Sequence, residues 1–182
     1  MNNIHPTITI DLILDRVTTK DVLHGILHSI LFHRLFGAVK PRDLEVLNVT
    51  MPGVSNPEIE RMVNKKVETF WKGIETGTNK RGQIVVTLSE KRAKKSWFYT
   101  EEEDVPWEQW IVNAELRQPK SDVDRLNFHA SIAASLTKSI HTMLEHTSSE
   151  KGRAVVPLIT KANEISPFPL DIAVKIGGVE VG

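Results

Sequence analysis

The fold depends on one stretch, residues 94–110, which reads KKSWFYTEEEDVPWEQW. It contains three of the four tryptophans of the chain and its only tyrosine. A short basic run precedes three consecutive aromatic residues, and four carboxylates in a row follow soon after them. Such a stretch is too polar and too aromatic at once for an ordinary core segment. What the rings do therefore depends on where the fold places them.

Strand patterns flank this stretch on both sides. Residues 83–88 form a short apolar run, and residues 107–116 form a second strand in which alternate side chains share one face. Because the two strands follow one another, we expect an antiparallel pair. The connection from Lys94 to Val105 is then an unusually long hairpin loop. We expect both the basic run and the acidic run Glu101–Asp104 to be solvated.

The rest of the chain alternates strand and helix patterns. We expect strands at Thr7–Leu14, Leu44–Met51 and Leu170–Ile176, helices that begin at Thr18 or Thr19, at Ser55 or Asn56 and at Ser121, a stop for the first helix at Gly37, an end of the last helix near Thr147, an extended proline-containing segment at 157–169 and a tail from Gly177. This order predicts one α+β domain over residues 1–182. Three helices pack on a mixed, mainly antiparallel sheet of about five strands.

Composition narrows the classes of function. The chain has 182 residues, 40% of them hydrophobic, with 23 basic and 23 acidic side chains and no cysteine. Balanced charge argues against nucleic-acid binding, and the lack of cysteine excludes disulfides and cysteine-based zinc sites. No apolar run approaches the roughly 18 residues of a membrane span, and no secretory pattern opens the chain. We therefore expect an intracellular globular domain.

The sequence shows no catalytic constellation. His24 and His28 lie one helical turn apart, but Gly25 stands where a zinc protease helix has glutamate. No further His, Asp or Glu completes a ligand set in the sequence, so we expect structural histidines. The glycines at 77 and 82 lack the lysine and the hydroxyl residue of a phosphate loop. We predict no cofactor, no metal and no enzymatic activity.

The aromatic triplet Trp97, Phe98 and Tyr99 leaves two alternatives open. The rings can fold back and close one end of the core. They can also project and dock on a partner, as exposed aromatic residues do at binding hot spots.

Several short motifs resemble a known family. Residues 27–37 are similar to the first helix of the autophagy-related protein 101 family, and residues 105–110 resemble its proline–tryptophan strand. Residues 156–159, followed by Asn163 and by 166–169, resemble its C-terminal segment. The order and spacing of the motifs agree over nearly the whole chain.

The resemblance implies a HORMA fold and a non-catalytic subunit of the complex that initiates autophagosome formation. Such a subunit pairs with the HORMA domain of autophagy-related protein 13, stabilises it, and recruits downstream autophagy factors through a Trp-Phe loop. Trp97 matches the tryptophan of that loop, and Phe98 is the second residue, with Tyr99 at the alternative spacing. Trp107 and Trp110 are expected to anchor the base of the loop.

The resemblance also implies a place and a partner surface. It predicts a cytoplasmic protein that joins the preautophagosomal structure when autophagy is induced. Exposed positions of Ser121–Thr147 are expected to contact the partner. We expect a single open-type state without closure of a C-terminal safety belt. The alternative is a HORMA adaptor of a checkpoint or meiotic chromosome complex that binds partner peptides.

Overall fold

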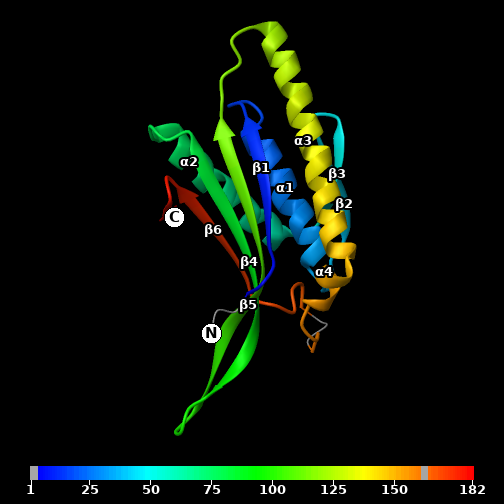
Figure 1. Cartoon of the computed structure of the whole chain (residues 1–182), viewed down its shortest axis with the longest axis vertical. Coiled ribbons are helices and arrows are strands. Elements are labelled where there is room, and N and C mark those ends of the chain that lie inside the picture. Colours follow the sequence, from blue (N-terminus) through cyan, green and yellow to red (C-terminus); the bar gives the residue numbers. More distant parts are fainter. Residues whose placement is uncertain (1–3, 161–163) are drawn as a thin grey trace.

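A computed structural model of the chain describes residues 4–160 and 164–182 (Figure 1). In chain order the elements are β1 (Thr7–Leu14), α1 (Thr19–Arg34), β2 (Pro41–Val46), β3 (Val49–Val54), α2 (Pro57–Thr76), β4 (Arg81–Lys95), β5 (Thr100–Leu116), α3 (Asp122–Ser148), α4 (Glu150–Ala154), β6 (Leu170–Ile176) and β7 (Val179–Val181). Part of the predicted extended segment, residues 161–163, lies outside the described residues. No helix in the described ranges is both long and apolar enough to cross a membrane.

Five strands form the main sheet in the order β1-β5-β4-β6-β7. β1 runs parallel to β5, whereas the other neighbours are antiparallel. One face packs against α1 and α2, which lie behind the sheet in Figure 1, while α3 runs along the side nearest β1. The predicted α+β class with a mixed, mainly antiparallel sheet is confirmed, although a fourth, short helix follows the third.

The predicted strand Leu44–Met51 is wrong, because two strands form a separate hairpin there. β2 and β3 pair antiparallel and turn at Leu47 and Asn48, which have φ values of 49° and 61°. This two-residue turn with positive φ matches the twist of a hairpin. The hairpin packs on α1, where a Cβ added at Gly25 would lie 2.9 Å from Met51 Sδ. Glycine therefore permits the close approach.

The long loop predicted between the third and fourth strands is also wrong. β4 continues to Lys95 and β5 begins at Thr100, so only four residues form the turn. The paired strands extend far beyond the rest of the sheet as a two-stranded ribbon (Figure 1). We call residues 90–105 the ribbon and residues 96–99 its tip.

The C-terminal residues and the helix caps match the predictions in part. The predicted tail from Gly177 instead forms β7, which pairs with β6 after a glycine turn. Asn56 and Ser121 cap α2 and α3 with their side chains, as predicted. Thr18 occupies the N-cap of α1 but donates its hydroxyl to the Asp15 carboxylate, 2.6 Å away, so it makes no side-chain cap.

A bulge at the base of the ribbon brings two neighbouring side chains inside. Leu88 pairs with Glu108 and Ser89 pairs with Pro106, so Trp107 is the extra residue. In a regular strand Trp107 and Glu108 would face opposite sides. Here both are buried, which is the usual consequence of a bulge, and bulges also tolerate proline.

Glu108 is the centre of a buried polar network. Its carboxylate accepts two hydrogen bonds of 2.7 Å from Arg34, one of 2.8 Å from Trp110 Nε1, and one from His146 Nε2. Arg34 also donates to the carbonyl of Gly152 at 2.8 Å. Glu108 is 0% exposed and Arg34 is 2% exposed. The network therefore joins α1, β5, α3 and α4 around a carboxylate that solvent does not reach, and a carboxylate in such a place is tolerated only when fully paired.

Removing the Arg34 guanidinium should show how strongly the fold depends on pairing the buried Glu108 carboxylate. We expect Arg34→Met to lower the free energy of unfolding by about 3–5 kcal/mol, because Glu108 loses its counter-charge inside the core. Urea denaturation measures the change. The matched control Arg92→Met removes an exposed arginine of the ribbon and should change stability by less than about 0.5 kcal/mol. Equal effects of the two variants would contradict the role given to the network.

Candidate functional site: the aromatic tip of the ribbon

Opposite charges face one another along the ribbon. Lys91 pairs with Asp104, Arg92 with Glu103 and Lys94 with Glu101 in the antiparallel register, so the basic run lies beside the acidic run. Lys91 Nζ lies 3.6 Å from the Asp104 carboxylate. The two runs are exposed, as expected, but they are strand residues and not a loop.

This pairing gives the ribbon a register that apolar packing does not supply. A two-stranded hairpin without a core is only marginally stable. Facing residues of opposite charge contribute roughly 0.2–1 kcal/mol each, and a shift of the register would move them apart together. Of the three facing pairs, Lys91 and Asp104 form an ion pair, while Arg92 pairs with Glu90 of its own strand. The ribbon also continues β4 and β5 directly, so its base is held by the main sheet.

The tip presents three aromatic rings to solvent. The Ser96 N–H donates to the Tyr99 carbonyl at 3.2 Å and closes the turn. Trp97 is 99% exposed, Phe98 is 93% exposed and Tyr99 is 58% exposed. The rings therefore do not fold back to close the core, which was one of the two alternatives.

The two tryptophans after the acidic run behave differently. Trp107 and Trp110 are buried, which confirms that they anchor the base of the ribbon. Trp107 packs edge-on against Phe168, with ring centroids 5.4 Å apart, and Arg34 stacks 5.6 Å from its ring. Ser89 also donates its N–H to the Pro169 carbonyl at 3.0 Å. The segment around Phe168 thus packs at the ribbon's base.

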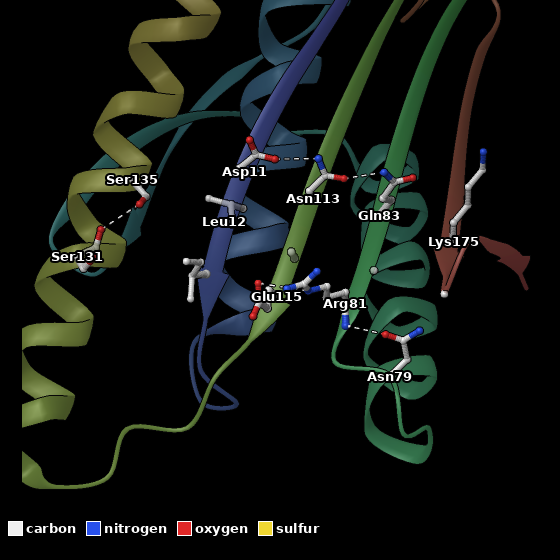
Figure 2. A pocket seen from close by; sticks show the side chains of 15 residues that line it. Asp11, Leu12, Asn79, Arg81, Gln83, Asn113, Glu115, Ser131, Ser135 and Lys175 are labelled. Carbon is white, nitrogen blue, oxygen red and sulfur yellow. Dashed lines mark hydrogen bonds and ion pairs between the residues drawn. The ribbon is translucent and has the colours of Figure 1, made fainter.

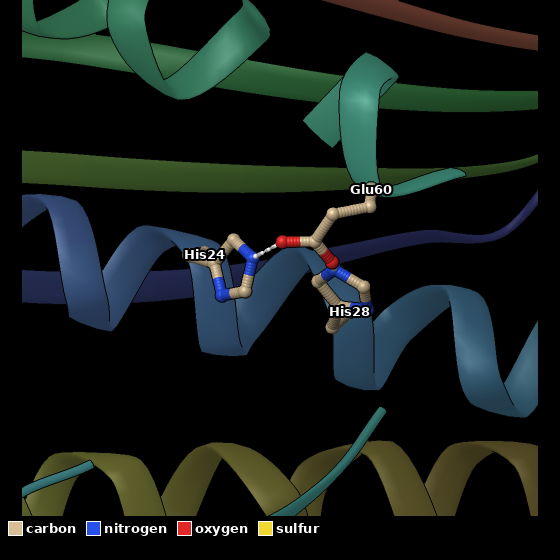
Figure 3. Close-up of side chains that lie close together, drawn as sticks. All are labelled: His24, His28 and Glu60. Carbon is tan, nitrogen blue, oxygen red and sulfur yellow. Dashed lines mark hydrogen bonds and ion pairs between the residues drawn. The ribbon is translucent and has the colours of Figure 1, made fainter. Parts of the chain in front are cut away.

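A second polar cluster involves the predicted histidine pair. His24 Nε2 lies 2.8 Å from one carboxylate oxygen of Glu60, and His28 Nε2 lies 2.9 Å from the other (Figure 3). Arg42 contacts the same carboxylate at 2.5 Å. The expectation that no acidic residue completes the histidine pair is wrong, because α2 brings Glu60 onto α1.

The hydrogen bonds of this cluster fit a structural role better than a metal site. The Val54 N–H donates to Nδ1 of His28 at 3.2 Å, so the neutral ring carries its proton on Nε2, which faces Glu60. A metal needs that nitrogen deprotonated. The Arg42 guanidinium adds a positive charge beside the carboxylate where a cation would bind. The residues are therefore a poor match for a metal ion.

The charges in this cluster shift two pKa values. Burial, with the nearby charges of His24 and Arg42, lowers the pKa of His28 to about 4, against an opposing effect of Glu60. Burial alone would raise the pKa of Glu60. The hydrogen bond and charge of His24, together with His28 and Arg42, outweigh it and lower that pKa. At neutral pH the cluster thus holds a neutral His28 and an ionised Glu60.

The fold defines an α+β domain of the HORMA type, and the exposed aromatic tip of its ribbon is a prominent feature of its surface. A family model described as Autophagy-related protein 101 matches residues 11–163. The chain belongs to this family of autophagy proteins.

Individual relatives agree with the family match. A protein named Autophagy-related protein 101 from Arabidopsis thaliana is 30% identical over 156 residues, which cover 81% of this chain and 73% of the relative. One from Schizosaccharomyces pombe is 35% identical over 107 residues, which cover 59% of this chain and 58% of the relative. One from Xenopus laevis is 22% identical over 142 residues, or 69% of this chain and 64% of the relative.

The histidine cluster predicts a pH dependence of stability. Between pH 7 and pH 5 the unfolded chain protonates His28 near its ordinary pKa, whereas the folded chain keeps this ring neutral. The unfolded state then binds more protons. The free energy of unfolding should therefore decrease as the pH is lowered, by about 2 kcal/mol from this residue between pH 7 and pH 5. Urea denaturation at several pH values measures it.

A pair of matched substitutions isolates this contribution. His28→Asn keeps a polar group near the Val54 N–H but cannot titrate, so its stability should change less between pH 7 and pH 5. His141→Asn removes an exposed histidine and should retain the full pH dependence. Parallel pH profiles for His28→Asn and the unmodified chain would rule out this origin.

Proposed function

We propose that this protein is a non-catalytic adaptor subunit of the autophagy-initiating kinase complex. In this role it pairs with and stabilises the HORMA domain of autophagy-related protein 13, and Trp97 and Phe98 recruit downstream autophagy factors. It acts in the cytoplasm and at the preautophagosomal structure. Family membership supports the autophagy role, and the exposure of the tip is the single observation that carries the recruiting role.

The tip suits recruitment for a physical reason. Large aromatic rings bury much apolar area with little loss of side-chain freedom, which is why they dominate binding hot spots. Trp97 and Phe98 leave nearly all of that area free for a partner, and the ribbon holds it away from the domain (Figure 1). Lys94 and Glu101 flank the rings with both signs of charge, which fits a protein partner with a mixed polar rim.

Removing the two rings tests recruitment separately from folding. We expect Trp97→Ala with Phe98→Ala to change the free energy of unfolding by less than about 0.5 kcal/mol, because neither ring packs on the core. Binding to the partner's HORMA domain should persist, while autophagic flux in cells that carry only the variant should fall. Trp107→Ala is the contrasting control and should cost about 3–5 kcal/mol.

Two results would contradict the recruiting role. One is normal flux with the double variant. The other is a loss of stability beyond roughly 3 kcal/mol, as expected for deleted core aromatic residues. Single variants of Phe98 and Tyr99 identify which of them acts with Trp97.

The outer face of α3 is the proposed partner surface. This helix of 27 residues buries only Ile132, Leu136, Ser139 and Met143. Val123, Leu126 and Leu144 remain exposed on it. Exposed apolar side chains along one helix suit a protein interface, although the area they offer is modest.

Charges on this face should weaken pairing. We expect Val123→Glu with Leu126→Glu to reduce binding to the partner's HORMA domain by at least about tenfold, because a buried interface would have to desolvate both carboxylates. Pulldown and calorimetry measure the loss. Lys72→Glu on the exposed side of α2 serves as control. Unchanged binding of the α3 variant would show that the interface lies elsewhere on the domain.

We also propose a single open-type state for the domain. β1 occupies the edge beside β5, and the β6–β7 hairpin lies at the opposite edge of the sheet, which supports this arrangement. One set of amide resonances is expected for β1, β6 and β7 in solution. A second, slowly exchanging set for these strands would show an additional closed state.

A further inference from the structure

Thr100 begins β5 directly after the aromatic tip, and four carboxylates follow it. The sequence from this residue reads TEEED, and all five side chains are exposed. They lie on the part of the ribbon that projects from the domain (Figure 1). A large enzyme can therefore reach the Thr100 hydroxyl without meeting the rest of the fold.

The backbone after Thr100 is already extended. Residues 100–104 belong to β5, so Glu101 and Glu103 project from one side of the strand, while Thr100 projects from the other. This stretch of β5 pairs with β4 on one side only, because the pairing of β5 with β1 begins at Gln109. An enzyme that binds an extended segment can approach from the unpaired side.

The ribbon carboxylates have fewer partners than a carboxylate at the other end of the same strand. On the open face of the main sheet, the Glu115 carboxylate lies 3.4 Å from Nε of Arg81 (Figure 2). Basic residues also face Glu101 and Glu103 across the ribbon, but no ion pair within the described ranges involves either carboxylate. Both are therefore open to basic groups of another protein.

The structure distinguishes Thr100 from other hydroxyl residues with a similar sequence. Six others also have a carboxylate three residues later: Thr18, Ser55, Thr87, Ser121, Thr142 and Thr147. None of these six is an exposed strand residue, because three precede a helix, two lie within α3 and one is half-buried in β4. A helical backbone directs the carboxylates one and three residues later to different sides, whereas a strand directs them to the same side.

We propose that Thr100 is phosphorylated by an acidophilic protein kinase, which is an enzyme that binds carboxylates on the C-terminal side of its acceptor. The Thr100 hydroxyl oxygen attacks the γ-phosphorus of ATP as the bond from that phosphorus to the bridging oxygen breaks. ADP leaves, and the hydroxyl proton passes to the general base of the kinase. Glu101 and Glu103 bind basic side chains of the kinase and position the acceptor.

The phosphate changes the charge beside the aromatic tip. It carries about −1.5 to −2 charges at pH 7. Lys95 faces Thr100 in the antiparallel register, and Tyr99 precedes it. A partner that covers Trp97 and Phe98 would have to remove water from the phosphate, which costs free energy. Phosphorylation therefore weakens recruitment by the tip, and this consequence rests on the proposed function.

A kinase assay on the folded, full-length chain tests the site. The chain is incubated with ATP and casein kinase 2, an enzyme of the acidophilic class, and mass spectrometry of proteolytic fragments locates the modified residue. One phosphoryl group on Thr100 is expected. Thr100→Val, which keeps a β-branched side chain in the strand, should not be modified there.

Two further variants separate the carboxylates from the general exposure of the ribbon. Glu101→Gln with Glu103→Gln keeps the acceptor hydroxyl and should lower the initial rate by at least about tenfold, because charge-assisted contacts with the kinase are lost. Ser96→Ala removes the exposed hydroxyl on the other side of the turn and should leave the rate unchanged.

The chain purified from the cells that produce it tests the site in its own setting. Phosphate on Thr100 should be found before autophagy is induced and should decrease afterwards. Thr100→Glu, which keeps a negative charge at this position, should lower autophagic flux relative to Thr100→Val.

Three outcomes would overturn the phosphorylation site. They are modification of other residues with Thr100 unmodified, equal rates for the unmodified chain and the double glutamine variant, and no phosphate on Thr100 in the chain purified from cells. Equal flux with Thr100→Glu and Thr100→Val would overturn the effect on recruitment. Normal flux with Trp97→Ala and Phe98→Ala would instead contradict the recruiting role itself, which the kinase assay does not depend on.

Discussion

The buried carboxylate of Glu108 sets the strictest constraint on this structure. A charged side chain that solvent does not reach must keep all its hydrogen-bonding partners, and those of Glu108 come from α1, β5 and α3. Arg34, one of these partners, also binds the Gly152 carbonyl of α4. The bulge at Trp107 is what allows Glu108 and its neighbour to point inward together. One ion pair thereby fixes where the helix layer meets the sheet. It also fixes the place where the ribbon leaves the domain.

The ribbon extends from this fixed base and holds the aromatic tip away from the domain (Figure 1). Apolar packing holds β4 and β5 up to Leu88 and Trp107, and facing charges continue the pairing beyond them. Nothing along the ribbon offers a core into which the aromatic tip could collapse. The rings thus stay exposed because of geometry and despite their hydrophobicity. Exposed apolar area of this kind on a projecting element is typical of interaction sites, which is consistent with the proposed recruiting role.

Local sequence patterns were enough to predict much of the fold, but they did not predict the long-range pairings. Alternation and caps located β1, α2 and α3, because these signals lie within a few residues. The sequence did not predict the hairpin at Leu47 and Asn48, because only one of its two turn residues commonly has a positive φ. Asparagine adopts this conformation readily, whereas leucine rarely does. Glu60 and Glu108 meet partners far away in the chain, and no spacing rule reveals such contacts. The ribbon did leave a signal, because the basic and acidic runs mirror one another about the aromatic triplet.

The central claim is that the ribbon is an ordered extension of the sheet in the free protein. Solution NMR tests it most directly, through cross-strand proton contacts and fast backbone motion along residues 91–104. The structure predicts contacts between Arg92 and Glu103 and between Lys94 and Glu101, with backbone order close to that of the main sheet. Absent contacts and the backbone motion of a disordered chain over these residues would contradict it.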